Sequence, residues 1–221
     1  MVSHIIHITL VFSIVWMTSV YAKEPTNLSI VKQQLIRYHD SGQYEKDINR
    51  TVHEAMRYLT WRLQNPSYIK GKKPAIVIDI DETALSNYAG LLRLDFGGTQ
   101  AHIRQAENQG DDPAIPSVLK LYQFAQSHDI AVFFITGRIE EDRDIAAQNL
   151  KNAGYEHWQQ LILRNATYRH TKAGVYKAAM RKEITQQGYD ILLNIGDQKS
   201  DLTGGYADKS FKLANPYYII P

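Results

Sequence analysis

Two aspartates follow a short apolar run in the first half of the chain. Residues 75–78 form a β-branched run that predicts a strand buried on both faces, and Asp79 and Asp81 come directly after it. Two carboxylates at the carboxyl end of one strand repel each other unless a cation or a proton intervenes. A hard cation that prefers oxygen ligands, such as Mg²⁺, suits this pair. The alternative interpretation is an ordinary strand-to-turn transition that ends in Asp.

Polar residues also follow two later apolar runs. Thr136 and Gly137 come after residues 130–135, and a hydroxyl with adjacent backbone N–H groups suits an anion. Thr is equally suited to the N-cap of a helix. Asp197 and Asp201 follow the last buried run and add two carboxylates four positions apart. Random surface residues would rarely place groups that suit phosphate or metal at the same edge of a sheet after each of three strands. The three sets therefore predict one site for phosphate and metal.

These residues can meet only if the apolar runs are parallel strands of one sheet. The runs that predict strands lie at residues 75–78, 130–135, 161–163, 191–195 and about 211–213. Helical patterns separate the strands, at residues 118–125, 146–153 and 176–184. Strands that alternate with helices imply right-handed crossovers. The sequence therefore predicts an α/β fold, with a doubly wound parallel sheet and helices on both faces.

Two segments fall outside this alternation. Apolar residues spaced three and four apart predict helices at 27–42 and 44–63, and we expect residues 23–66 to form a helical appendage to the main body. Residues 88–113 are polar and rich in Gly and Asp. An insertion after the first strand lies over the edge where such sheets bind ligands, so we expect a small lid there. A long surface loop is the alternative.

The N-terminus has the pattern of a secretory signal peptide. Residues 1–22 contain no Lys, Arg, Asp or Glu, are mostly apolar, and end in a small-residue pattern at Ala22 before a polar chain begins. An uncleaved signal anchor is the alternative, because the apolar stretch is nearly long enough to span a bilayer. The prediction is a secreted or periplasmic protein with one domain, residues 23–221, that does not remain in a membrane after cleavage.

Composition excludes several classes of protein. The chain has 25 Lys and Arg against 23 Asp and Glu, so its formal net charge of +2 gives no reason to expect binding to a nucleic-acid polymer. It has no cysteine, which excludes disulfides and thiolate metal sites. Its eight histidines lack the spacing of a zinc hydrolase. A metal ion would therefore be held by carboxylate or imidazole groups.

The ordered motifs resemble those of the haloacid dehalogenase superfamily, and most closely its acid phosphatase branch, subfamily IIIB. That branch includes plant vegetative storage proteins and secreted bacterial acid phosphatases. The stretches that carry the resemblance are 77–87 (VIDIDETALSN), 136–138 (TGR), 143, 149–150 (NL), 153–155 (AGY), 161–164 (LILR), 176–181 (YKAAMR) and 194–202 (NIGDQKSDL). The resemblance extends from about Ile30 to the C-terminus.

The resemblance implies a mechanism. Asp79 would be the nucleophile that forms an aspartyl phosphate, and Asp81 would protonate the leaving group and later activate water. We expect the negative charge around Asp81 to favour its protonated form. Mg²⁺ would bind the Asp79 carboxylate, the Asp81 backbone carbonyl and Asp197, with Asp201 as a further carboxylate on the metal side. A second Asp at position 81 favours hydrolysis of phosphate esters over dehalogenation.

The resemblance also implies the groups that bind phosphate. Thr136 and Gly137 would donate hydrogen bonds to the phosphoryl oxygens, and Lys177 would neutralise both the nucleophile and the phosphoryl group. Lys172 is the rival to Lys177, because it lies nearer the expected start of the helix. The spacing of Tyr176-Lys177 to the later Gly-Asp motif favours Lys177.

Three functions remain open at this point. The first is a secreted phosphomonoesterase that acts on small phosphate esters, among them nucleotides or aromatic phosphates. The second is a storage or binding protein with inactive motifs, although the retained Asp79 argues against it. The third is a phosphotransferase to an alcohol.

Two further questions also stay open. Arg143 and Arg181 either bind phosphate or form structural ion pairs. The protein could also form a homo-oligomer.

Overall fold

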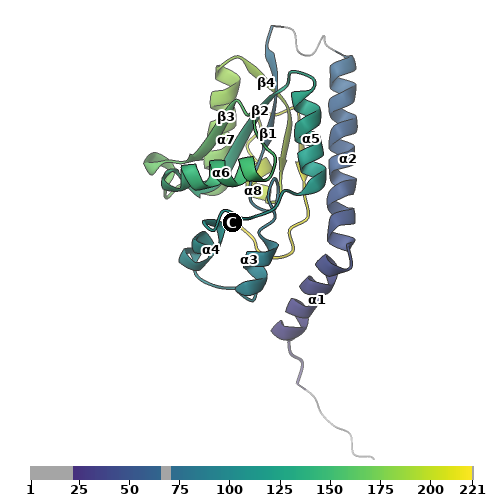
Figure 1. The fold of residues 1–221 in the computed structure, drawn as a ribbon, viewed down its shortest axis with the longest axis vertical. Coiled ribbons are helices and arrows are strands. Elements are labelled where there is room, and N and C mark those ends of the chain that lie inside the picture. Colours follow the sequence, from purple (N-terminus) through teal and green to yellow (C-terminus); the bar gives the residue numbers. More distant parts are fainter. Residues whose placement is uncertain (1–21, 66–70, 221) are drawn as a thin grey trace, which may run out of the picture.

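The computed structural model describes residues 22–65 and 71–220. Apart from Ala22, the predicted signal peptide lies outside these residues. The structure has one sheet of five parallel strands in the order β3-β2-β1-β4-β5 (Figure 1). The strands are β1 (Lys73–Ile78), β2 (Ala131–Ile139), β3 (Gln160–Arg164), β4 (Tyr189–Gly196) and β5 (Lys209–Lys212). The predicted doubly wound α/β fold is confirmed.

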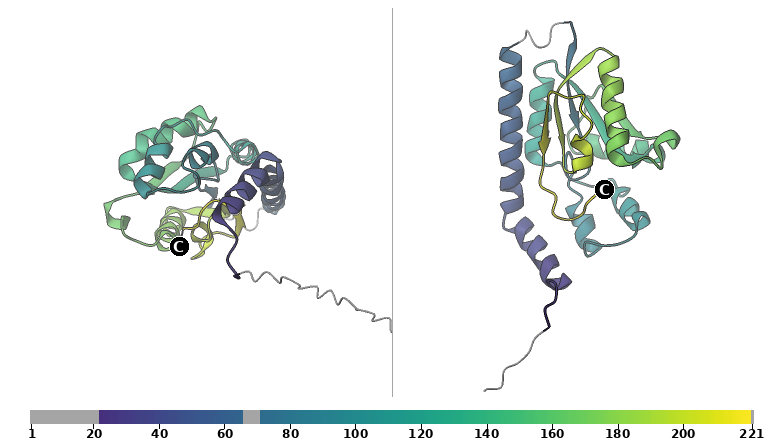
Figure 2. Two further views of the ribbon diagram at one scale, coloured as in Figure 1. Left: turned by 90° about the horizontal axis from the view of Figure 1, so that it is seen from below. Right: turned by 180° about the vertical axis from the view of Figure 1, so that it is seen from behind.

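Helices cover both faces of the sheet. They are α1 (Leu28–Asp40), α2 (Gln43–Gln64), α3 (Tyr88–Arg93), α4 (Gln100–Glu107), α5 (Pro116–Gln126), α6 (Arg143–Asn152), α7 (Ala173–Gln186) and α8 (Lys199–Leu202), with 3₁₀ turns at Glu140–Asp142 and Ala166–Tyr168. Figure 2 shows α2 and α5 on one side of the sheet and α7 on the other. Among the residues described, no helix has the length and apolar character needed to cross a membrane.

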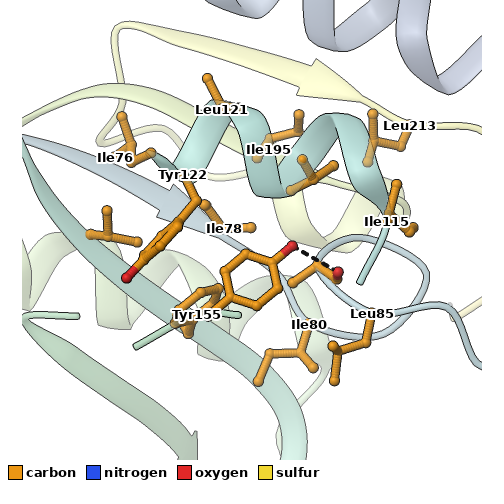
Figure 3. Close-up of a cluster of buried hydrophobic side chains, with 14 of the residues drawn as sticks. Ile76, Ile78, Ile80, Leu85, Ile115, Leu121, Tyr122, Tyr155, Ile195 and Leu213 are labelled. Carbon is orange, nitrogen blue, oxygen red and sulfur yellow. Dashed lines mark hydrogen bonds between the residues drawn. The ribbon is translucent and has the colours of Figure 1, made fainter. Parts of the chain in front are cut away.

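The strands alternate their side chains between two cores. Ile76 and Ile78 of β1 pack in the larger core beneath α2, α5 and α6, whereas Val77 packs in the smaller core beneath α7. Figure 3 shows part of the larger core, where the Tyr155 hydroxyl donates a 2.8 Å hydrogen bond to the backbone carbonyl of Ala84. Because β1 is buried on both faces, it needs a continuous apolar run, as the sequence indicates.

Strand order reverses between β1 and β4. From β1 the chain builds outward through β2 to β3, and it then returns to place β4 on the other side of β1. The backbone N–H of Asp79 donates to the carbonyl of Ile195, so the carboxyl ends of β1 and β4 lie together. In open α/β sheets such a switch point opens a crevice for ligands.

Helices α1 and α2 occupy the segment expected to form an appendage. Gly42 separates them in a left-handed conformation with φ of +76°, which glycine adopts without strain. Side chains of α2, from Tyr44 to Leu59, belong to the larger core and pack beside α5. Arg62, near the end of α2, forms ion pairs with Asp190 and Asp208. Thus α2 contributes to the main core.

The insertion after β1 contains two short helices, α3 and α4. The chain leaves and returns at one place, since Ser86 N–H donates to Pro113 O and Ile115 N–H donates to Ala84 O. Thr99 caps α4 and accepts a hydrogen bond from the backbone N–H of His102. Figure 1 shows both helices beyond the carboxyl edge of the sheet, where the C-terminal end of the chain also lies. The insertion therefore stands beside the switch point.

Candidate active site

Three carboxylates converge at the switch point. Asp79 follows β1, while Asp197 and Asp201 belong to the turn after β4 and to α8, and one oxygen from each lies within 4.8 Å of the others. All three residues are buried. Burial disfavours the charged form, and the pKa values of Asp79 and Asp197 are raised above their usual range. The fold thus concentrates negative charge where the topology opens a crevice.

Lys177 supplies the cation within this cluster. Its Nζ donates to Asp79 Oδ1 at 2.5 Å and to Asp201 Oδ1 at 2.6 Å. Burial opposes its charge, but the two carboxylates raise its pKa above the usual range, so it is an ammonium ion. Lys172, the alternative from the sequence, is the exposed N-cap of α7. The structure brings Lys177, and not Lys172, to Asp79.

The cluster has the charge and the chemistry of a site for a divalent metal. Three carboxylates against one ammonium leave an excess of two negative charges in a buried place. The atoms that could bind a metal here are all carboxylate oxygens, which suits a hard cation. Among the described residues no donor reaches Asp79 Oδ2, and Asp197 Oδ1 receives only a 3.3 Å contact from Thr83. Asp79, Asp197 and Asp201 therefore fit a divalent cation.

Asp81 has a different environment from the other predicted metal residues. Its carboxylate lies outside the cluster of three and pairs with Arg138, whose Nη2 donates to Oδ1 at 2.7 Å. Asn87 Nδ2 donates to the same oxygen at 2.8 Å. Burial alone would raise the pKa of Asp81, but the guanidinium outweighs it and the pKa is lowered. The expectation that surrounding negative charge would favour the protonated form is wrong for this structure.

Thr136 and Gly137 lie within β2, which continues to Ile139. The N-cap interpretation of Thr136 is therefore wrong: α6 begins later, at Arg143, after Asp142. Thr136 is fully buried, and its Oγ1 lies 3.5 Å from Asp81 Oδ2. Gly137 is exposed, with no neighbouring atom within 4 Å of the place where a Cβ would stand. This open backbone beside Asp81 allows an anion to approach.

Arg143 and Arg181 have structural partners. Arg143 pairs with Glu140 and donates to the backbone carbonyl of Leu161 at 2.8 Å. Arg181 is buried and donates to the backbone carbonyls of Asp201 and Thr203. Arg181 thus holds the end of α8, the helix that carries Asp201, and both arginines have partners other than a phosphate.

Several side chains around the site carry no role in the sequence analysis. Arg138 and Asn87 lie inside the motifs, but their common partner, Asp81, is set by the fold. Glu82 is buried and accepts hydrogen bonds from the Asn87 backbone N–H at 2.8 Å and from the Tyr218 hydroxyl at 2.5 Å. Asn215 Nδ2 donates to Asp197 Oδ2 at 2.7 Å. Nothing in the sequence indicates that the C-terminal residues reach this site.

The insertion adds acidic groups on the side of Asp81. Asp112 lies 3.7 Å from Arg138, and burial raises its pKa to about 7. Burial also raises the pKa of Glu107, in α4, to about 8. Arg104 of α4 forms a bidentate pair with Asp142 at 2.8 Å for both bonds, which ties this helix to the turn before α6. The insertion is thus joined to the body beside the proposed proton donor.

Comparisons with known proteins agree with this geometry. Residues 6–221 match the family model for the HAD superfamily, subfamily IIIB (acid phosphatase). A stem 28 kDa glycoprotein of Glycine max is 35% identical, with 83% of this chain and 72% of the relative covered. Acid phosphatase 1 of Solanum lycopersicum is 34% identical, with 80% and 69% covered. The class C acid phosphatase of Bacillus anthracis shares the fold, with a TM-score of 0.70, 22% identity and 86% of both chains covered. The chain therefore belongs to the acid phosphatases of subfamily IIIB in the haloacid dehalogenase superfamily.

Proposed function

We propose that this protein is a secreted, Mg²⁺-dependent phosphomonoesterase that works through an aspartyl phosphate on Asp79. Hydrolysis of phosphate monoesters is the activity of its family. The observation that carries the proposal is the buried Asp79 carboxylate beside Lys177, with an excess of two negative charges around it. A nucleophile, a fixed cation and a set of metal ligands are the parts that phosphoryl transfer requires.

In the first step, a carboxylate oxygen of Asp79 attacks phosphorus and the bond from phosphorus to the leaving oxygen breaks. Asp81 gives its proton to that oxygen, so the alcohol leaves neutral. In the second step, water attacks the phosphorus of the aspartyl phosphate and gives a proton to the Asp81 carboxylate. Inorganic phosphate leaves and Asp79 is restored. Asp79, Asp197 and Asp201 would hold a divalent cation, which would supply positive charge to offset the repulsion between carboxylate and phosphate.

Lys177, Thr136 and Gly137 are the phosphate-binding groups in this proposal. The ammonium of Lys177 has three N–H donors, of which two go to Asp79 and Asp201, so the third is available to a phosphoryl oxygen. The Thr136 hydroxyl and the exposed Gly137 backbone lie on the Asp81 side. The phosphoryl group would therefore lie between the Lys177 ammonium on α7 and the hydrogen-bond donors of Thr136 and Gly137 on β2.

The substrate class follows from the surroundings of the site. We expect residues 88–113 to act as a small lid, because they stand beyond the carboxyl edge of the sheet. A lid of two short helices would admit varied leaving groups, among them nucleosides or phenols. The sequence of residues 1–22 supports export to a periplasm or out of the cell.

The test is the release of p-nitrophenol from its phosphate ester by the purified protein. Measured from acid to neutral pH with Mg²⁺ present, turnover should be highest at acid pH, where Asp81 carries its proton, and it should be lost in EDTA. Folded, Mg²⁺-loaded protein without turnover on this ester or on nucleotides would instead favour a storage or binding protein. A new phosphate ester formed when an alcohol is added would favour a phosphotransferase.

Arg138 should set the pH range of the reaction. Replacing Arg138 with Met removes the guanidinium that lowers the pKa of Asp81, so this pKa should rise. Because Asp81 acts in its protonated form, the decline of kcat/KM at high pH should move upward by the same amount. Arg143→Met is the control, since Arg143 pairs with Glu140 instead. A pH profile unchanged in Arg138→Met would contradict this role.

A further inference from the structure

The C-terminal segment, residues 213–220, lies against the turn that carries Asp197. It follows β5 and crosses the carboxyl edge of the sheet, so that its end lies beside α8 and the insertion (Figure 2). The Leu213 backbone N–H donates to Gly196 O at 2.9 Å, which fixes where the segment begins. The segment is thus close to the candidate metal ligands although it lies outside every motif of the site.

Asn215 connects this segment to Asp197. Its Nδ2 donates to Asp197 Oδ2 at 2.7 Å. Its Oδ1 accepts from the backbone N–H groups of Tyr217 at 2.8 Å and Tyr218 at 3.4 Å. An Asn side chain that bonds to the backbone two residues later forms a fixed local turn. The amide is therefore held in one orientation by its own turn, with its N–H group directed at the carboxylate.

A second donor to the same oxygen also depends on this segment. Gln198 Nε2 donates to Asp197 Oδ2 at 2.6 Å. The Gln198 amide is held in turn by the segment, because Oε1 accepts from the Ile220 N–H at 3.1 Å and Nε2 also lies 3.4 Å from Tyr218 O. Two N–H donors occupy the acceptor positions of Oδ2. The carboxylate is then held through Oδ2, and Oδ1, which has only its 3.3 Å contact from Thr83, is the oxygen left for a cation.

We propose that Asn215 is a positioning residue for the metal site, and that the C-terminal segment orients Asp197 through Asn215 and Gln198. The proposal rests on the proposed function, in which Asp197 is a metal ligand. Groups that hydrogen-bond to metal ligands fix the orientation of those ligands, and their loss typically weakens metal binding by about 10- to 100-fold. Asn215 is not one of the three residues that would hold the cation, so it would act through its hydrogen bond to Asp197.

The test is Mg²⁺ and Mn²⁺ binding to the full chain, measured by isothermal titration calorimetry. Asn215→Ala should weaken binding by about 10-fold. The Mg²⁺ concentration for half-maximal hydrolysis should rise equally, and kcat should return to near the wild-type value at saturating Mg²⁺. Tyr217→Phe is the matched control: the Tyr217 hydroxyl is buried without a hydrogen-bond partner among the described residues, so its removal should leave metal affinity unchanged.

The outcomes separate this proposal from the proposed function. Folded Asn215→Ala that binds Mg²⁺ as tightly as the wild type would overturn the positioning role. Wild-type protein that binds neither cation, or binding that survives Asp197→Asn, would overturn the metal site itself. If Asn215→Ala does not fold, Gln198→Met replaces it, because it removes the other donor to Asp197 Oδ2 and leaves the Asn215 turn in place. The same 10-fold loss is expected, and unchanged affinity again contradicts the proposal.

Discussion

Replacing Asp79 with Asn is expected to lower kcat for p-nitrophenyl phosphate by at least about 10⁴-fold, as loss of a catalytic nucleophile does in other enzymes. An amide has nearly the shape of a carboxylate but does not attack phosphorus, so the aspartyl phosphate does not form. The fold should survive, because Lys177 keeps its 2.6 Å pair with Asp201. The measurements are kcat at saturating Mg²⁺ and mass spectrometry of acid-quenched protein, which should show a phosphorylated Asp79 in the wild type only.

Asp129→Asn is a suitable control for that variant. Asp129 is exposed, precedes β2 at the opposite end of the sheet, and has a φ of +55°, which Asn also adopts readily. The Asp129→Asn variant should keep kcat within about twofold of the wild-type value, because substitutions of exposed residues away from the site have small effects. Turnover retained in folded Asp79→Asn would assign the nucleophile to another group.

Local sequence pattern predicts the parts of this fold that depend on burial. The run from Ile76 to Ile78 predicts β1 because a strand covered on both faces needs apolar side chains at every position. The polar residues after β1 and β4, and those in the last part of β2, then share one edge, because parallel strands end together. Asp79 and Lys177 are 98 positions apart, and they meet because of the topology of the fold. The local sequence around either residue does not indicate the contact. The ordered set of family motifs is what indicates that these distant residues meet in one site.

The contacts that escape sequence reasoning are those between polar side chains on different elements. Arg138 reaches Asp81 across 57 positions and reverses the expected direction of the Asp81 pKa. Asn215 reaches Asp197 from a segment without apolar periodicity. A charge pattern along the chain does not indicate which partner a side chain meets, since that depends on how strands are ordered. The partner of each charged side chain, and the direction of its pKa shift, therefore follow from the structure and not from the sequence alone.

Replacing Lys177 with Met should have the largest effect on stability. Without the ammonium, three buried carboxylates face one another, and leaving buried charge unpaired costs about 3–5 kcal/mol. Burial already raises the pKa values of Asp79 and Asp197, and the variant should raise them further. The folded variant then binds more protons than the unfolded chain between about pH 4 and the raised pKa values, so its stability falls as pH rises. Urea unfolding at pH 5 and pH 8 in EDTA should show the larger loss at pH 8.

Added Mg²⁺ should restore part of that stability, since the cation compensates the same charge. Turnover should remain about 10²- to 10³-fold below the wild type even then, because the phosphoryl group loses a fixed cation. Lys172→Met is the control: Lys172 is the exposed N-cap of the same helix, and its loss should change neither quantity appreciably. A stability loss equal at pH 5 and pH 8 would show that unpaired carboxylates do not cause the loss, because Met keeps most of the methylene packing of Lys177. In that case charge balance would not explain why an ammonium is buried beside Asp79.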